Sequence, residues 1–103
     1  MPDTTTDPLT GLFNRRYMTS HLESTLNRAA ETGKPASLMV LDIDFFKSIN
    51  DSLGHEGGDE AIVQFARAIR SAIPHGALVA RMGGEEFAIA YRGDMMLIEP
   101  DEL

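Results

Sequence analysis

The stretch that decides the fold is Arg81-Met82-Gly83-Gly84-Glu85-Glu86-Phe87. Apolar runs lie on both sides of its glycine pair. Paired glycines between such runs are typical of a tight β-hairpin turn, because a primed turn needs positive φ at both central positions. The turn would place Glu85 and Glu86 at the mouth of the hairpin, beside backbone N–H groups. Adjacent carboxylates in such an opening suit a site for a metal ion and a phosphate; the alternative is an exposed hairpin with solvated acids.

A second acidic pair ends an earlier apolar run. Residues 36–43 are almost continuously apolar, which predicts a buried central strand. Asp42 and Asp44 at its end would then point to the same face of the sheet. Two carboxylates at a strand end beside a helix N-terminus favour a hard cation such as Mg²⁺; the competing interpretation is a helix cap at Asp44 and a solvated Asp42. We expect the two acidic pairs to meet in space.

Apolar periodicity and chain breaks predict the remaining elements. Asn14 would cap the first helix and Gly33 would end it. In chain order the expected elements are that helix, the strand at 36–43, a short helix at 45–53, a glycine-rich loop at 54–59, a helix capped by Asp59, and strands at 77–80 and 87–91 on either side of the glycine turn. This order predicts an α/β (α+β) fold in which helices cover a central sheet.

The composition limits the partners and the compartment. The chain has 103 residues, 43 % of them hydrophobic, which suits one small domain. The net charge of −7 argues against duplex nucleic acid and anionic membranes as partners. There is no cysteine, and no apolar run approaches the roughly 20 residues of a membrane span. We expect a cytoplasmic protein with a flexible lead at 1–6, a domain at 7–92 and an atypical tail at 93–103.

A phosphate site is predicted where the short helix begins. The backbone N–H groups of Phe45, Phe46 and Lys47 would open that helix and could receive phosphate oxygens. Lys47 adds a positive charge. No Walker A loop occurs, and the residues after Asp42 do not follow the EF-hand pattern.

A base-recognition site is predicted around the glycine-rich loop. The carboxylate of Asp59 can accept from N1–H and the exocyclic amine of guanine, while the amide of Asn50 contacts the remaining edge. The alternative is turn chemistry, with Asn50 as a C-cap and Asp59 as an N-cap. His55 lies in the same loop and, taken alone, is more often structural than catalytic.

Four motifs occur in order with compatible spacing: Asp7-x-Leu9-Thr10-Gly11-Leu12-x-Asn14-Arg15-Arg16, Asp42-Ile43-Asp44-x-Phe46-Lys47-x-Ile49-Asn50-Asp51, Gly54-His55-x-x-Gly58-Asp59, and Arg81-x-Gly83-Gly84-Glu85-Glu86-Phe87. Together they resemble the GGDEF family, the diguanylate cyclases, in a GGEEF variant. The resemblance implies condensation of two GTP into cyclic di-GMP with release of pyrophosphate. It also implies a palm-like nucleotidyl cyclase fold, here truncated after the GGEEF hairpin.

The resemblance also implies a role for each matching residue. Asp42, the Ile43 carbonyl and Glu85 would hold two Mg²⁺ ions, with Mn²⁺ as a possible substitute. Glu85 would accept the proton of the ribose 3′-hydroxyl with help from Glu86, and Lys47 would stabilise the transferring phosphoryl group. The residues expected to contact GTP are Phe45, Phe46, Lys47, Asn50, His55, Asp59, Gly83 and Gly84.

The resemblance further implies a homodimer, because each domain would hold one GTP and two must face each other. Two alternatives stay open at this point. One is a non-catalytic GTP-binding or protein-interaction module derived from a GGDEF domain. The other is a plain α/β scaffold whose acids are only solvated.

Overall fold

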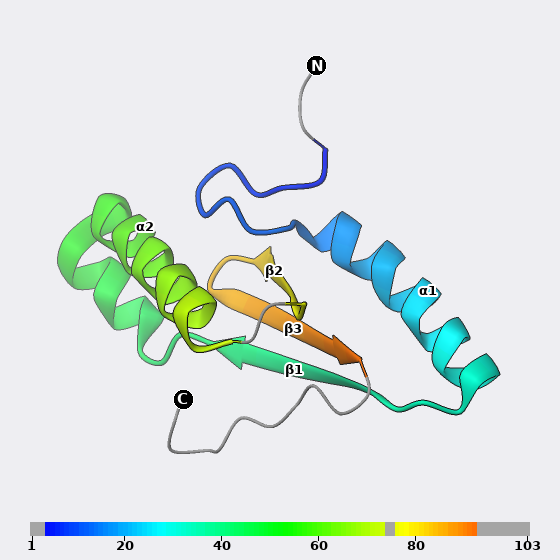
Figure 1. The fold of residues 1–103 in the computed structure, drawn as a ribbon. Coiled ribbons are helices and arrows are strands. Elements are labelled where there is room, and N and C mark those ends of the chain that lie inside the picture. Colours follow the sequence, from blue (N-terminus) through cyan, green and yellow to red (C-terminus); the bar gives the residue numbers. More distant parts are fainter. Residues whose placement is uncertain (1–3, 74–75, 93–103) are drawn as a thin grey trace.

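The computed structural model describes residues 4–73 and 76–92, and the predicted tail at 93–103 lies outside them. Two helices and three strands make up this part of the chain (Figure 1): α1 (Arg15–Thr32), β1 (Ala36–Asp42), α2 (Phe46–Ala72), β2 (Leu78–Gly83) and β3 (Glu86–Arg92). The strands form one antiparallel sheet in the order β1-β3-β2. The predicted α/β fold class is confirmed, and the element order is confirmed except that one kinked helix, α2, replaces the two helices and the loop that were predicted between the first and second strands.

Strand β1 differs from the buried central strand that was predicted for residues 36–43. In the described sheet β3 is central, and β1 pairs with it along one side only. Met39 and Leu41 pack against the core, whereas Leu38 and Val40 on the opposite face are 51 % and 57 % exposed. The strand is apolar on both faces, but among the described residues only one face of it is covered.

The two faces of the sheet carry side chains of different size. Phe87, Ile89 and Tyr91 of β3 point to one face and pack with Leu12 and with the apolar side of α2. Ala88 and Ala90 alternate with them and, together with Ala80 of β2, pack with Met18 of α1. Because successive residues of a strand point to opposite faces, α1 and α2 cover opposite faces of the sheet.

Helix α1 begins and ends as predicted. The side chain of Asn14 accepts a hydrogen bond from the backbone N–H of Tyr17 at 2.9 Å, which satisfies one of the free N–H groups of the first turn. Gly33 closes the helix in the left-handed conformation, with φ 73°, and its N–H bonds to the carbonyl of Ala29.

Helix α2 contains a sharp kink where a six-residue loop was predicted. Gly54 has φ 74° and ψ −176°, and the residues on both sides of it are helical. The predicted glycine-rich loop at 54–59 is therefore wrong, and Asp59 lies within the helix instead of capping it. One glycine is enough to reverse the chain, since it adopts a conformation that other residues avoid. In Figure 1 the two halves of α2 lie side by side.

Candidate functional site

The two acidic pairs meet at one end of the sheet. Asp42, the last residue of β1, stands opposite Glu86, the first residue of β3. The backbone N–H of the next residue, Ile43, donates to the carbonyl of Glu85 at 3.2 Å. The expectation that the strand end and the hairpin turn lie together is thus confirmed at the level of the backbone. Asp42 and Glu86 are exposed, and Glu85 is half-buried.

The hairpin turn is shifted by one residue from its predicted position. Gly83 pairs with Glu86, so Gly84 and Glu85 are the two turn residues and Gly83 ends β2. A register irregularity between Arg81 and Gly83 causes this shift. Both glycines still have positive φ, 157° and 43°, and a Cβ on either would meet no atom within 4 Å. The space beside the turn is open.

Asp44 does not share a strand face with Asp42. Strand β1 ends at Asp42, and Asp44 lies in the turn that leads into α2. The prediction that both carboxylates point to one sheet face is therefore wrong, because the strand is too short to include the second. The N-cap of α2 is Phe45, without a side-chain cap bond, so the alternative of capping by Asp44 is wrong as well.

Helix α2 begins directly beside the acidic pairs. Its first residue is Phe46, and the N–H of Ile49 makes the first bond back to the carbonyl of Phe45 at 3.0 Å. The N–H groups of Phe46 and Lys47 therefore have no acceptor within the helix. They lie a few residues after Asp42, and the side chain of Lys47 is exposed. A helix N-terminus with free N–H groups and a lysine suits a phosphate.

The kink in α2 brings Asn50 against Gly58, the residue before Asp59. Asn50 lies in the first half of the helix and touches Gly58 in the second half. Asp59 is the next residue and is exposed, as is His55 just after the kink. The structure thus joins Asn50 to the segment that carries Asp59. Capping plays no part there, because all these residues except Gly54 are helical.

The expected metal ligands are of the chemical type that binds a hard cation. Two carboxylates, Asp42 and Glu85, and the Ile43 carbonyl are all oxygen donors, which Mg²⁺ prefers. Within residues 4–73 and 76–92, no three His, Asp or Glu side chains gather closely enough to hold an ion by themselves. A Mg²⁺ ion usually keeps several waters and is bound through one or two carboxylates plus substrate phosphates, so this donor set suits such an ion.

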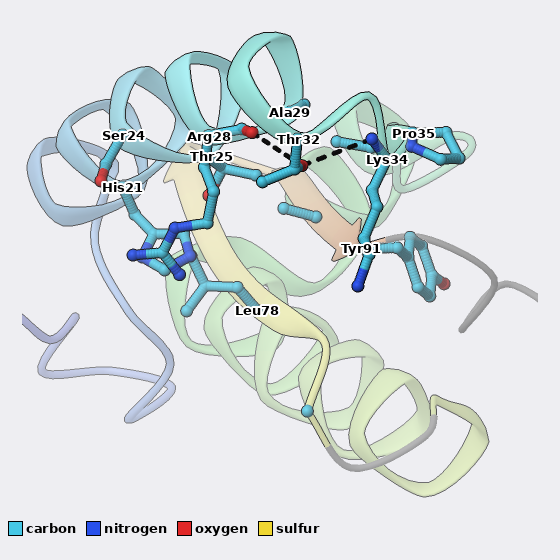
Figure 2. A pocket seen from close by; sticks show the side chains of 13 residues that line it. His21, Ser24, Thr25, Arg28, Ala29, Thr32, Lys34, Pro35, Leu78 and Tyr91 are labelled. Atoms are coloured by element: carbon cyan, nitrogen blue, oxygen red, sulfur yellow. Dashed lines mark hydrogen bonds between the residues drawn. The ribbon is translucent and has the colours of Figure 1, made fainter.

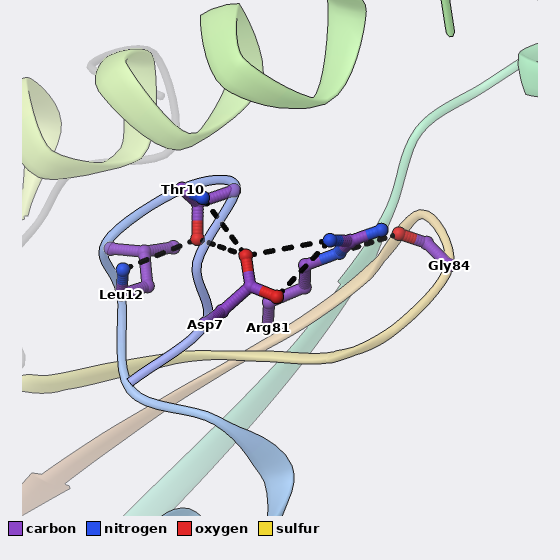
Figure 3. Close-up of polar contacts among 5 residues, drawn as sticks. All are labelled: Asp7, Thr10, Leu12, Arg81 and Gly84. Carbon is purple, nitrogen blue, oxygen red and sulfur yellow. Dashed lines mark hydrogen bonds and ion pairs between the residues drawn. The ribbon is translucent and has the colours of Figure 1, made fainter. Parts of the chain in front are cut away.

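A network of polar contacts links the N-terminal loop to the hairpin turn (Figure 3). The carboxylate of Asp7 accepts hydrogen bonds from the N–H and hydroxyl of Thr10 and from the guanidinium of Arg81. The Nε of Arg81 donates to the carbonyl of Gly84 at 2.9 Å. The sequence analysis assigned no role to Asp7 or Arg81, although both residues are named in the motifs quoted there.

The N-terminal segment before Asp7 is also attached to the fold. The side chain and the backbone N–H of Asn14 donate to the carbonyls of Thr4 and Thr5, both at 2.9 Å. The domain boundary at residue 7 stays a prediction.

A hollow of about 540 Å³ lies at the opposite end of the sheet, between α1 and β2 (Figure 2). It is bordered by the first residues of β1 and β2, Ala36 and Leu78, and by His21, Arg28 and Lys34 from α1 and the loop after it. The carboxylates of the GGEEF turn lie at the other end of these strands. The residues that line the hollow include His21, Arg28 and Lys34, so its chemistry is not that of the acidic pairs.

Comparison with known proteins identifies the family. The family model described as "Diguanylate cyclase, GGDEF domain" matches residues 4–94. The chain belongs to the GGDEF domain family. Its relatives include the response regulator PleD of Caulobacter vibrioides, 51 % identical over 84 residues, which are 82 % of this chain and 18 % of that protein. A probable diguanylate cyclase of Escherichia coli, DgcC, is 39 % identical over 89 residues, 86 % of this chain and 24 % of that protein.

Solved structures agree with this assignment. The GGDEF domain of DgcB from Caulobacter crescentus, in complex with c-di-GMP, matches with a TM-score of 0.86 and 40 % identity, over 91 % of this chain and 53 % of that one. This GGDEF domain therefore spans less than a third of the curated relatives named above and about half of the solved DgcB chain. None of the helices among its described residues combines the length and apolar character that crossing a bilayer requires.

Proposed function

We propose that this GGDEF domain binds GTP with Mg²⁺ and, as a pair of facing copies, condenses two GTP into cyclic di-GMP with release of pyrophosphate. One observation carries the proposal. The register of β1 on β3 brings Asp42 opposite Glu86, and the Ile43–Glu85 bond holds the turn beside the N-terminus of α2. The oxygens proposed to bind the metal ion and the N–H groups proposed to bind phosphate come from this one end of the sheet, which supports phosphoryl transfer there.

The acidic end of the sheet would hold the cation and accept the proton. Asp42, the Ile43 carbonyl and Glu85 are the proposed Mg²⁺ ligands, and Mn²⁺ would suit the same oxygens. Bound Mg²⁺ supplies charge neutralisation for the triphosphate. Glu85 is the proposed acceptor of the 3′-hydroxyl proton, and the exposed Glu86 carboxylate beside it would assist.

The triphosphate would lie at the N-terminus of α2, and the base would lie beside Asn50 and Asp59. The N–H groups of Phe45 and Phe46 would receive phosphate oxygens, and Lys47 would stabilise the transferring phosphoryl group. Asn50 and Asp59 would read the guanine edge, with His55 shaping the pocket. The open space beside Gly83 and Gly84 leaves room for the sugar and phosphates.

A second copy of the domain completes the reaction. One copy holds one GTP, and each 3′-hydroxyl must attack the α-phosphate of the GTP on the other copy, so two half-sites face each other across a two-fold axis. We also propose a cytoplasmic location, because GTP is supplied there.

The test is incubation of the purified protein with GTP and Mg²⁺, followed by chromatographic detection of cyclic di-GMP. The wild type should form product, and Glu85→Gln should form none, because the substitution removes a cation ligand and the proton acceptor. Glu23→Gln, at an exposed position in the middle of α1, is the matched control and should keep the wild-type rate.

A non-catalytic GTP-binding module is the second candidate. The observation in its favour is that, within residues 4–73 and 76–92, no three His, Asp or Glu side chains form a cluster that could hold a metal ion without the phosphates of a substrate. Calorimetry with a non-hydrolysable GTP analogue separates the two proposals. Binding without cyclic di-GMP formation at high protein concentration would favour the module over the enzyme.

A further inference from the structure

Helix α2 folds back at Gly54 so that one side chain of its first half fills a gap in its second half. The gap is at Gly58, which is buried. A Cβ placed on Gly58 would lie 2.2 Å from Oδ1 of Asn50, far closer than real Cβ contacts, and 3.3 Å from the ring of Phe46. The amide of Asn50 therefore occupies the space that any side chain at position 58 would need.

The atom that would have to move is the end of a flexible side chain. Oδ1 of Asn50 can swing away by rotation about χ1 and χ2, whereas the ring of Phe46 needs to give by only a few tenths of an ångström. A methyl group at position 58 should thus leave the helix largely intact and turn the Asn50 amide away from its place beside Gly58.

We infer that Gly58 is a positioning residue that sets the Asn50 amide and thereby the preference for guanine. The inference rests on the proposed GTP binding and adds to it the origin of base selectivity. Asp59 follows Gly58 directly in the second half of α2, so the absent Cβ lets the Asn50 amide lie beside the residue that precedes Asp59. With the amide displaced, the guanine edge that Asn50 would contact has no hydrogen-bond partner, while the contacts to the phosphates are unchanged.

The neighbouring glycine provides a matched control. A Cβ on Gly57 would lie 2.2 Å from Cβ of Leu53, an atom fixed to the backbone, and it does not approach Asn50 within the three closest contacts. Gly57→Ala should therefore strain the kink and lower the melting temperature without moving the base readers. Gly58→Ala should move the Asn50 amide and change the melting temperature little.

The experiment measures binding of non-hydrolysable GTP and ATP analogues, with Mg²⁺, by calorimetry. We expect Gly58→Ala to lose about tenfold in affinity for the GTP analogue, the effect of about one hydrogen bond, with affinity for the ATP analogue unchanged. Asn50→Ala should lose as much, and Gly58→Ala should add nothing in the Asn50→Ala background. Gly57→Ala should keep the wild-type ratio of the two affinities.

Two results would overturn the inference: an unchanged GTP-to-ATP ratio in Gly58→Ala, or an equal loss of that ratio in Gly57→Ala. If the wild type binds neither analogue, it is the proposed function that fails. The contact is then judged by the side-chain amide resonances of Asn50 in NMR spectra. These should shift in Gly58→Ala and not in Gly57→Ala, and their constancy in both variants would refute the positioning role.

Discussion

Asp7 and Arg81 form an ion pair with Oδ1 and Nη1 3.2 Å apart, although 74 positions separate them in the chain. Both side chains are largely removed from solvent, with 16 % of Asp7 and 18 % of Arg81 exposed. Arg81 also bonds to the carbonyl of Gly84 in the hairpin turn. The pair therefore connects the loop before α1 to the turn that carries Glu85.

Replacing Asp7 by asparagine should destabilise the fold. Asn keeps the shape of the side chain but removes the charge and one of the oxygens that accept from Thr10 and Arg81. We expect a loss of about 1–2 kcal/mol in the free energy of unfolding, measured by urea denaturation. Glu23→Gln at an exposed site should change it by less than about 0.5 kcal/mol. Equal values for the two variants would show that the ion pair does not stabilise the fold.

Replacing Arg81 by lysine should slow product formation. A single ammonium group cannot reach both Asp7 and the Gly84 carbonyl with the geometry of a guanidinium. The turn would lose one restraint, and Glu85 would be less well placed. We expect the rate of cyclic di-GMP formation at saturating GTP to fall by about 10- to 100-fold. Arg67→Lys on the exposed side of α2 is the control. A wild-type rate in Arg81→Lys would show that the contacts among Asp7, Arg81 and Gly84 do not affect catalysis.

Replacing Tyr91 by phenylalanine should stabilise the fold. The Tyr91 hydroxyl is buried, and no described residue bonds to it. Removing a buried hydroxyl without a partner should raise the free energy of unfolding by about 1 kcal/mol, measured by urea denaturation. Tyr17→Phe, which keeps the ring stacked on Phe13, is the comparison at a less buried position. A loss of stability in Tyr91→Phe would mean that the hydroxyl has a partner.

The same residue predicts how stability depends on pH at the alkaline end. Burial raises the pKa of Tyr91 above its ordinary value of 10.0. The folded protein therefore holds this proton more tightly than the unfolded chain does, and the associated stability is present below pH 10.0 and lost as the pH rises above it. The difference in unfolding free energy between wild type and Tyr91→Phe should shift further in favour of the variant above pH 10.0. A constant difference across that range would contradict the assignment.

Replacing Phe45 by glycine should stabilise the fold although it removes a large side chain. Phe45 has φ 58° in the left-handed region and is 80 % exposed, so its ring buries little and its backbone is strained. We expect a gain of about 1 kcal/mol. Leu53→Gly is the matched control, since Leu53 is 66 % exposed but helical, and it should lose about 1 kcal/mol. Thermal denaturation of the two variants should give shifts of opposite sign.

Features fixed by neighbouring residues could be predicted from the sequence. The cap at Asn14 and the glycine end of α1 follow from local hydrogen bonding and from the left-handed conformation, and both were correct. The hairpin was also correct, but its two central residues were not. The bulge before Gly83 depends on how β2 pairs with β3, and that pairing leaves no local pattern.

Most features that depend on distant residues could not be predicted. The exposure of Leu38 and Val40 depends on which elements cover β1, and an apolar run alone does not say whether both faces are covered. The segment after Gly54 has the composition of a loop, yet five of its residues continue the helix because the kink needs only one glycine. For the candidate site, the meeting of the two acidic pairs was predicted, whereas the contribution of Asp7 and Arg81 required the folded structure.

The unequal faces of the sheet have a consequence for sequence variation. On the α2 side, Phe87, Ile89 and Tyr91 fill the layer with large side chains, which can be exchanged for others of similar volume at modest cost. On the α1 side, three alanines hold the helix close, and any added methylene would force it outward. Natural drift and directed evolution should therefore yield many tolerated substitutions in the layer between the sheet and α2, and few in the layer between the sheet and α1.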